Sequence, residues 1–270
     1  MLQRILTGAA LLPLLWVIGW APFPVFLALA AVFAVICHRE MGTMLGAAGL
    51  PVRLVSGLLA NGLLLLPFVL ERVEVLPALV LGALLIIGET SARAEQSALA
   101  HELTGSLTAL LFPGLLLLSL VMLRAQDTEG LPGPGLLLFL HACVLVGDTA
   151  AYFTGRALGR TPLAPRISPK KTVEGLVGGL LFGTLVGAWV ARTLLPAWAD
   201  WGWALGLALA CTAAGVLGDL MVSALKRSCG VKDTGALLPG HGGLLDRIDG
   251  LLLAGPVLWV ALALGLVPAG

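Results

Sequence analysis

Apolar runs of about 20 residues recur along the whole chain, separated by short segments that contain charges or prolines. A helix needs about 20 apolar residues to cross the hydrocarbon core of a bilayer. Charges and prolines divide the sequence into about nine candidate spans, at residues 5–20, 22–37, 54–70, 73–89, 104–123, 134–154, 175–195, 202–226 and 249–268. The sequence therefore predicts an all-α polytopic membrane protein with about nine transmembrane helices.

Composition excludes several other classes of protein. Hydrophobic residues make up 59% of the 270 residues and charged residues only 11%, whereas soluble domains average about 25% charged residues. The net charge of +1 provides no strongly basic surface, so nucleic acid is not an expected partner. The four cysteines are far apart in sequence, which predicts small packing residues rather than a zinc or redox site.

Positive charges predict the orientation in the membrane. With nine spans, only Arg72, Arg124 and Arg192 of the 16 lysines and arginines lie on the side opposite the amino terminus. Cytoplasmic loops carry such an excess, so the amino terminus is expected in the cytoplasm and the protein in the inner membrane. The polar motifs described below all lie in the second half of the chain. We therefore interpret residues 1–103 as scaffold or dimerisation helices and residues 104–270 as the region that carries the functional motifs.

Two polar clusters are predicted near the cytoplasmic ends of helices. Asp148 lies one helical turn before Tyr152, and an acid in an apolar helix is costly unless it is paired, metal-bound or hydrated. A helix–helix hydrogen bond is the alternative for Asp148. The second cluster runs from Ser168 to Gly175, and its Ser-Pro pair predicts a helix that begins with Ser168 as N-cap.

The second cluster contains two adjacent lysines, Lys170 and Lys171. Two lysines at a helix start oppose the helix dipole and so favour a bound anion, although an ordinary cytoplasmic stop signal explains them equally well. Every lysine of the chain lies in or beside the polar segments 155–174 and 227–249, whereas arginine supplies all other positive charges. A compact ammonium suits phosphate binding, and chance is the alternative. The lysines are Lys170, Lys171, Lys226 and Lys232.

The third cluster descends one face of a predicted helix. Its members stand at i, i+4, i+7 and i+8, which is one helical face: Asp219, Ser223, Lys226 and Arg227. A carboxylate, a hydroxyl and two cations on one face of a membrane helix require a hydrated cavity or cleft beside it.

The fourth cluster contains a glycine-rich loop and two acids. Lys232 and Asp233 precede it, and Gly240, His241, Gly242 and Gly243 can bring backbone amides close to phosphate oxygens. Asp246 and Asp249 then open the last span, where acids also stabilise a helix start. With Asp148 and Asp219 they place four acids at one predicted membrane level. Uncompensated carboxylates repel, so a hard cation such as Mg²⁺ is expected among them.

Small residues repeat every four positions in two spans. One ridge comprises Gly175, Gly179, Gly183 and Gly187, and the other comprises Gly202, Gly206, Ala210, Ala214 and Gly218. Such ridges let membrane helices approach backbone to backbone, so close packing of both spans is predicted.

These motifs resemble those of a known family. The segment from Ser223 to Asp249 is similar to the signature of phosphatidate cytidylyltransferases, and segments 148–156 and 168–175 resemble two further blocks of that family. The resemblance implies that CTP and phosphatidic acid react to give CDP-diacylglycerol and pyrophosphate. It also implies a Mg²⁺ requirement, with one or two cations in the carboxylate cluster, an all-helical fold and a homodimer.

The resemblance also implies roles for individual residues. The expected metal ligands are Asp219, Asp246, Asp249 and Asp148. The expected phosphate-neutralising cations are Lys226, Arg227 and Arg247, with Lys170 and Lys171 over the nucleotide or the leaving pyrophosphate. The remaining expected substrate contacts are Tyr152, Ser168, Thr172, Ser223, Lys232, Asp233, Gly240, His241, Gly242 and Gly243.

Two alternatives to this function stay open on sequence grounds. A CTP-dependent lipid kinase of the polyprenol type would transfer the γ-phosphoryl group and release CDP, so the nucleotide product distinguishes it. A secondary transporter should show interrupted spans at corresponding places in two halves. The polar motifs here lie in the second half only, which disfavours a transporter.

Overall fold

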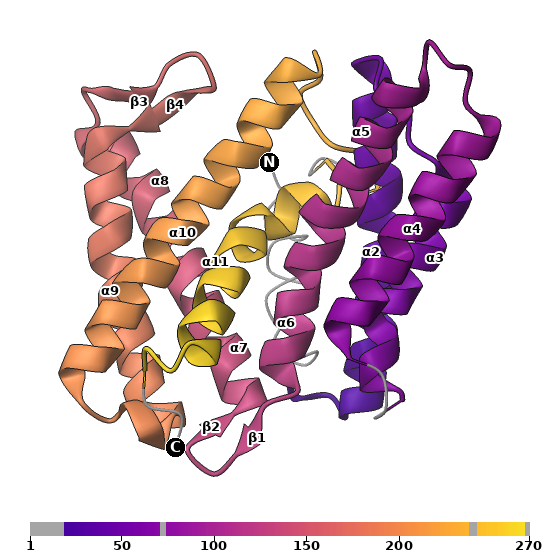
Figure 1. The fold of residues 1–270 in the computed structure, drawn as a ribbon. Helices are drawn as coiled ribbons and strands as arrows, with labels where there is room; N and C mark the ends of the chain where they lie inside the picture. Colours follow the sequence, from indigo (N-terminus) through magenta and orange to yellow (C-terminus); the bar gives the residue numbers. More distant parts are fainter. Residues whose placement is uncertain (1–18, 71–73, 238–241, 268–270) are drawn as a thin grey trace. The chain divides into compact units, whose positions relative to one another are not determined.

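A computed structural model of the chain describes residues 19–70, 74–237 and 242–267. The chain divides into two compact units. Of the described residues, unit 1 contains those in 22–118 and 225–247, and unit 2 contains those in 119–224 and 248–267. Each unit is helical and is described by itself (Figure 1).

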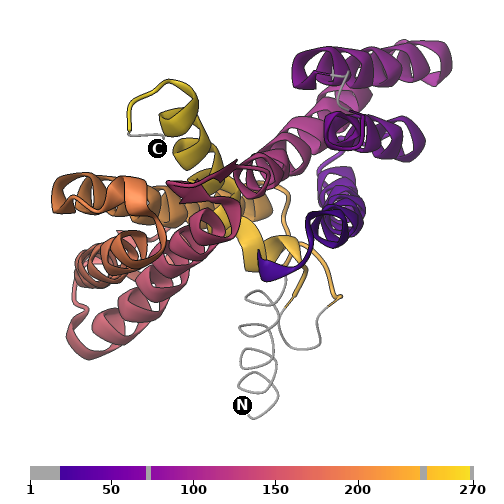
Figure 2. The ribbon, with the colours of Figure 1, turned by 90° about the horizontal axis from the view of Figure 1, so that it is seen from below.

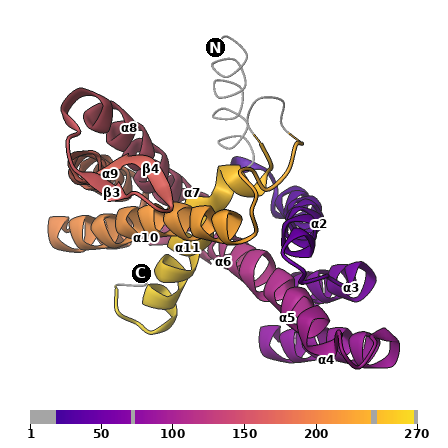
Figure 3. The ribbon, with the colours of Figure 1, turned by 90° about the horizontal axis from the view of Figure 1, so that it is seen from above.

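Unit 1 is built mainly from the helices of the first half. They are α2 (Phe23–Ala47), α3 (Leu54–Leu65) with the 3₁₀ turn η1 (Leu66–Phe68), α4 (Val75–Arg93), α5 (Leu99–Ala109) and the π-helical segment η2 (Leu110–Leu115). Helix α3 contacts both α2 and α4. Met41, Leu64 and Ile86 are buried in this unit and form part of its apolar core. Figure 3 shows α2, α3, α4 and α5 as neighbours.

Unit 2 is built mainly from the second half. Its elements include β1 (Asp127–Thr128), β2 (Leu131–Pro132), α7 (Gly133–His141), the π-helical η3 (Ala142–Val146), α8 (Gly147–Leu158), β3 (Pro162–Ala164), β4 (Ser168–Thr172), α9 (Val173–Leu194) and η4 (Pro196–Trp198). Helices α6 (Leu116–Arg124), α10 (Trp201–Ser228) and α11 (Leu245–Ala263) contribute residues to both units. Helices α8 and α9 lie side by side, as Figure 2 also shows.

The predicted glycine ridge of α9 is confirmed as a packing surface. A Cβ atom added at Gly179 would lie 2.8 Å from the carbonyl oxygen of Gly147, and one at Gly183 would lie 2.8 Å from that of Cys143. The α10 ridge behaves differently along its length. A Cβ at Gly218 would lie 2.5 Å from the carbonyl oxygen of Asp249, whereas one at Gly206 would meet no atom within 4 Å.

This difference predicts opposite outcomes for two otherwise similar substitutions. Gly183→Ala should destabilise the protein by about 1–3 kcal/mol, because the new methyl group must displace packed atoms. Gly206→Ala is the matched control and should be neutral or stabilising by up to about 1 kcal/mol, because alanine favours the helix. Thermal unfolding in detergent measures both changes, and an equal response of the two variants would contradict the packing argument.

The helical membrane class is confirmed in outline. Among the described residues, six helices are long and apolar enough to cross a membrane: Phe23–Ala47, Val75–Arg93, Leu99–Arg124, Gly133–Leu158, Val173–Leu194 and Trp201–Ser228. The predicted spans 54–70 and 249–268 correspond to a shorter apolar helix, Leu54–Phe68, and to α11. The predicted span 5–20 lies almost wholly outside the described residues. The count of about nine spans stays a prediction.

One predicted helix start is wrong. Ser168 does not cap a helix but begins strand β4, which pairs with β3 through Ala164 and Ser168. Helix α9 begins at Val173, and Thr172 is its N-cap, with its Oγ1 atom accepting a hydrogen bond of 3.1 Å from the amide of Gly175. Lys170 and Lys171 therefore lie on a strand before the helix. Neither lysine lies in the first turn of α9, so the predicted opposition to the helix dipole is wrong.

Candidate active site

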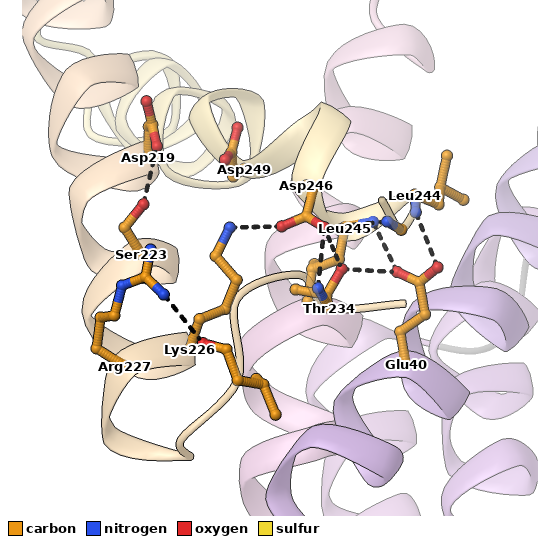
Figure 4. A network of polar contacts seen from close by, with 12 residues as sticks. Glu40, Asp219, Ser223, Lys226, Arg227, Thr234, Leu244, Leu245, Asp246 and Asp249 are labelled. Atoms are coloured by element: carbon orange, nitrogen blue, oxygen red, sulfur yellow. Dashed lines mark hydrogen bonds and ion pairs between the residues drawn. The ribbon is translucent and has the colours of Figure 1, made fainter. Parts of the chain in front are cut away.

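An enclosed ion pair joins Lys226 and Asp246 in unit 1. Lys226 lies near the end of α10, and Asp246 lies in the first turn of α11. The Nζ atom of Lys226 is 2.5 Å from Oδ1 of Asp246, and the two side chains are 11% and 4% exposed (Figure 4). Two residues predicted as catalytic from separate sequence clusters are therefore in direct contact.

Further donors surround the carboxylate of Asp246. Its Oδ2 atom accepts hydrogen bonds from the amide of Thr234 at 2.9 Å, from the Thr234 hydroxyl at 3.0 Å and from the amide of Gly243 at 3.0 Å. Burial disfavours the charged form of Asp246, but the hydrogen bonds from Lys226, Thr234 and Gly243 outweigh burial and hold its pKa below the ordinary value. The carboxylate is therefore ionised at neutral pH.

Glycine is required in the turn before Asp246. Gly242 has a φ angle of +80°, a left-handed conformation that side chains rarely adopt. A Cβ atom at Gly242 would also lie 2.6 Å from Oδ2 of Asp246. The predicted close backbone approach is thus seen at Gly242 and Gly243, but the partner is a carboxylate of the protein. Gly240 and His241 lie outside the described residues.

Glu40 and Thr234 belong to this cluster and were not predicted from the sequence. Glu40 lies on α2, is buried, and accepts hydrogen bonds from the amides of Leu244 at 2.8 Å and Leu245 at 2.9 Å. The Thr234 hydroxyl lies 3.2 Å from Glu40, which links Glu40 to Asp246. An acid inside a long apolar helix is the signal that should have drawn attention to Glu40.

A second lysine–aspartate pair lies in unit 2. Lys171 on β4 forms an ion pair of 2.5 Å with Asp219 on α10, and the side chains are 26% and 25% exposed. Ser223 donates a hydrogen bond of 3.3 Å to the other oxygen of Asp219. The predicted single helix from Asp219 to Arg227 is confirmed, because α10 is continuous through these residues. The contact between Asp219 and Lys171 joins two motifs that the sequence keeps 48 positions apart.

The structure corrects one premise of the metal prediction. Asp219 and Asp246 are not uncompensated, because each pairs with a lysine. In the part of the chain that the structure describes, no three His, Cys, Asp or Glu side chains form a group that could hold a metal ion. Repulsion among four bare carboxylates is therefore no longer an argument for a cation, although carboxylate oxygens remain the donors that Mg²⁺ prefers.

The other predicted site residues lie on α8, on α11 and in the segments around the two ion pairs. Asp148 and Tyr152 are exposed on α8, where Arg156 donates a hydrogen bond of 3.1 Å to the Tyr152 hydroxyl. Asp249 lies on α11 and accepts a hydrogen bond of 2.8 Å from the amide of Gly250. The remaining predicted cations and one acid are exposed: Lys170, Arg227, Lys232, Asp233 and Arg247. Nothing in the geometry assigns these exposed residues to one phosphate or another.

The chain is similar to proteins of a known family. The model of a family described as "Cytidylyltransferase family" matches residues 2–264. A phosphatidate cytidylyltransferase of Brucella suis is 44% identical over 151 residues, which are 56% of this chain and 54% of the relative. One from Bacillus subtilis is 45% identical over 132 residues, 48% of this chain and 49% of the relative. The chain thus matches these curated relatives over about half of their length.

Proposed function

Because this chain belongs to the cytidylyltransferase family, we propose that it transfers CMP from CTP to phosphatidic acid. The products are CDP-diacylglycerol, an intermediate of phospholipid biosynthesis, and pyrophosphate. The names of the Brucella and Bacillus relatives support this choice of substrates. The observation that best supports this function is the enclosed Lys226–Asp246 pair beside the glycine turn. The ammonium group of Lys226 is a compact positive charge of the kind that suits phosphate binding.

The proposed reaction is an in-line displacement at the α-phosphorus of CTP. A phosphate oxygen of phosphatidic acid forms the new bond to that phosphorus. The bond from the α-phosphorus to the bridging oxygen breaks, and pyrophosphate leaves with the electron pair. Phosphoryl transfers of this kind depend on positioning and charge neutralisation. Lys226 and Lys171 are proposed to neutralise phosphate charge, and Asp219 and Asp246 to hold these lysines in position.

We propose Mg²⁺ as the cofactor. This cation is usually held by one or two carboxylates together with substrate phosphates, rather than by a complete cage of protein ligands. Asp219 and Asp246 would supply such carboxylates, with Asp249 and Asp148 as further candidates, and a second cation would need more than one of them. When bound, Mg²⁺ would withdraw charge from the phosphate oxygens of CTP. This mode of binding needs no preformed group of three acids.

The proposal places the site at the cytoplasmic face of the inner membrane, where CTP is dissolved and phosphatidic acid can present its headgroup. The distribution of lysine and arginine supports this orientation. A homodimer is also proposed, from the resemblance of the motifs alone.

Cysteine labelling tests the proposed orientation. A cysteine at position 167 or 236 should react with a membrane-impermeant reagent only from the cytoplasmic side, and one at 128 or 199 only from outside. The four native cysteines are buried, so the unmodified protein should give low background labelling. The reverse pattern would contradict the orientation and the proposed access of CTP.

The activity is tested by identifying both products. Purified protein should convert CTP labelled on the α-phosphate and phosphatidic acid into a labelled lipid that migrates as CDP-diacylglycerol, with release of pyrophosphate. A labelled lipid formed only from γ-labelled CTP, with CDP as the other product, would identify a lipid kinase instead. Absence of either product under conditions that keep the protein folded would remove the enzyme proposal.

A further inference from the structure

The enclosed cluster of unit 1 consists of Glu40, Lys226, Thr234, Gly243 and Asp246. Among these, Glu40 alone comes from the first half of the chain. It lies on α2, close to 200 positions before the residues that it contacts. Glu40 is 7% exposed, and the described partners of its carboxylate are two backbone amides and one hydroxyl. An acid placed in this way in a membrane helix must be held by what surrounds it.

Glu40, on α2, caps the amino-terminal end of another helix, α11. Leu244 directly precedes α11 and Leu245 is its first residue, so their amides have no partner within the helix. Glu40 accepts both, one on each oxygen, at 2.8 and 2.9 Å. A carboxylate at this end of a helix is also stabilised by the helix dipole. Glu40 therefore accepts two amides that have no partner within α11.

Two glycines show that the loop is built around this carboxylate. A Cβ atom added at Gly235 would lie 2.8 Å from Oε1 of Glu40, and one at Gly243 would collide with Oε2 of Glu40. The Thr234 hydroxyl lies between the two acids, 3.2 Å from Glu40 and 3.0 Å from Asp246. The same loop that packs on Glu40 thus supplies the donors that hold Asp246.

We propose that Glu40 is a positioning residue for Asp246 and Lys226, which would make α2 part of the catalytic framework. This inference rests on the proposed function only for its kinetic consequence. Loss of the cap should release the start of α11 and the turn at Gly243. Asp246 would then hold Lys226 less firmly, so turnover should fall more than substrate binding.

The test compares Glu40→Gln with Glu102→Gln. Glutamine keeps the shape of Glu40, but its NH₂ group cannot accept one of the two amide hydrogen bonds. Glu102 is the matched control, because it is a mostly buried acid of the same unit that pairs with Arg53 and makes no described contact with the loop. We expect kcat of Glu40→Gln to fall roughly 100-fold, the cost of a small misplacement at a reacting centre. KM for CTP should change by less than about threefold.

Hydrogen exchange gives a readout that does not depend on activity. The amides of Leu244 and Leu245 should exchange faster in Glu40→Gln than in the wild type, and not in Glu102→Gln. If Glu40→Gln does not fold, Thr234→Val and Thr234→Ser replace it, and only the valine variant should lose turnover. A wild type that makes no CDP-diacylglycerol would refute the proposed function and leave the exchange result to decide the role of Glu40.

Three results would overturn the inference. The first is unchanged exchange at Leu244 and Leu245 in Glu40→Gln. The second is a kcat of that variant within about twofold of the wild type. The third is an equal loss of kcat in Glu102→Gln at an equal shift of thermal stability, which would show that any buried acid of this unit has the same effect.

Discussion

Asp219→Ala should lower turnover by about 10³-fold at every Mg²⁺ concentration, while the protein stays folded in detergent. The expected loss corresponds to about 4 kcal/mol of transition-state stabilisation. Asp219 holds Lys171 and accepts a hydrogen bond from Ser223, and it is one of two acids proposed to bind Mg²⁺. Its removal therefore affects both the cation and the position of a lysine. Initial rates over a Mg²⁺ titration, with thermal unfolding of the same samples, measure the effect.

Asp219 is a cleaner choice for this experiment than Asp246. Asp246 accepts two backbone amides in addition to Lys226, so its replacement should also loosen the turn around Gly243. Asp246→Ala is expected to be inactive too, but with a lower unfolding temperature. Asp200→Ala is the control, because Asp200 is an exposed acid that directly precedes α10 and accepts a hydrogen bond from the amide of Gly202, 19 positions before Asp219. Recovery of Asp219→Ala at high Mg²⁺, or near-normal turnover, would refute the assignment.

Helices were predictable from the sequence because the bilayer imposes a simple length rule. Charged or turn residues bound the apolar runs predicted at 73–89 and 202–226. The corresponding helices, α4 (Val75–Arg93) and α10 (Trp201–Ser228), begin and end within a few residues of those bounds. N-cap preferences gave the wrong start for α9, because two residues in the sequence suit that position. Ser168 and Thr172 both suit an N-cap, and the hairpin of β3 and β4 uses Ser168 in strand pairing, which leaves the helix start to Thr172.

The residues of the two ion pairs stand out in the sequence, but their contacts do not, and their roles in a site stay a prediction. Asp219, Lys226 and Asp246 could be identified because acids and lysines are rare in this chain. Their pairing could not, because it depends on how distant segments meet. Lys171 neutralises Asp219, and Lys226 neutralises Asp246, so the sequence argument from uncompensated acids was mistaken. Glu40 contacts residues about 200 positions away, and no local pattern reveals such a contact.

Replacing the lysine of an ion pair by arginine should have the second large effect, a loss of kcat/KM. Lys226→Arg keeps the charge but replaces a compact ammonium with a planar, five-donor group. The side chains of Lys226 and Asp246 are almost fully enclosed, so the larger guanidinium must displace packed atoms or leave Asp246. We expect kcat/KM to fall at least about tenfold, which corresponds to about 1.4 kcal/mol.

Lys171→Arg provides the internal comparison. The pair of Lys171 and Asp219 is about a quarter exposed, so a guanidinium has room to reach Asp219 from the solvent side. The loss of kcat/KM in Lys171→Arg should therefore be smaller than in Lys226→Arg, and the order of the two variants follows from enclosure. Measurement of kcat/KM for CTP and for phosphatidic acid in both variants decides between two explanations of the lysine pattern. If both variants match the wild type, only net charge matters at these positions, and the exclusive use of lysine there is an accident of composition.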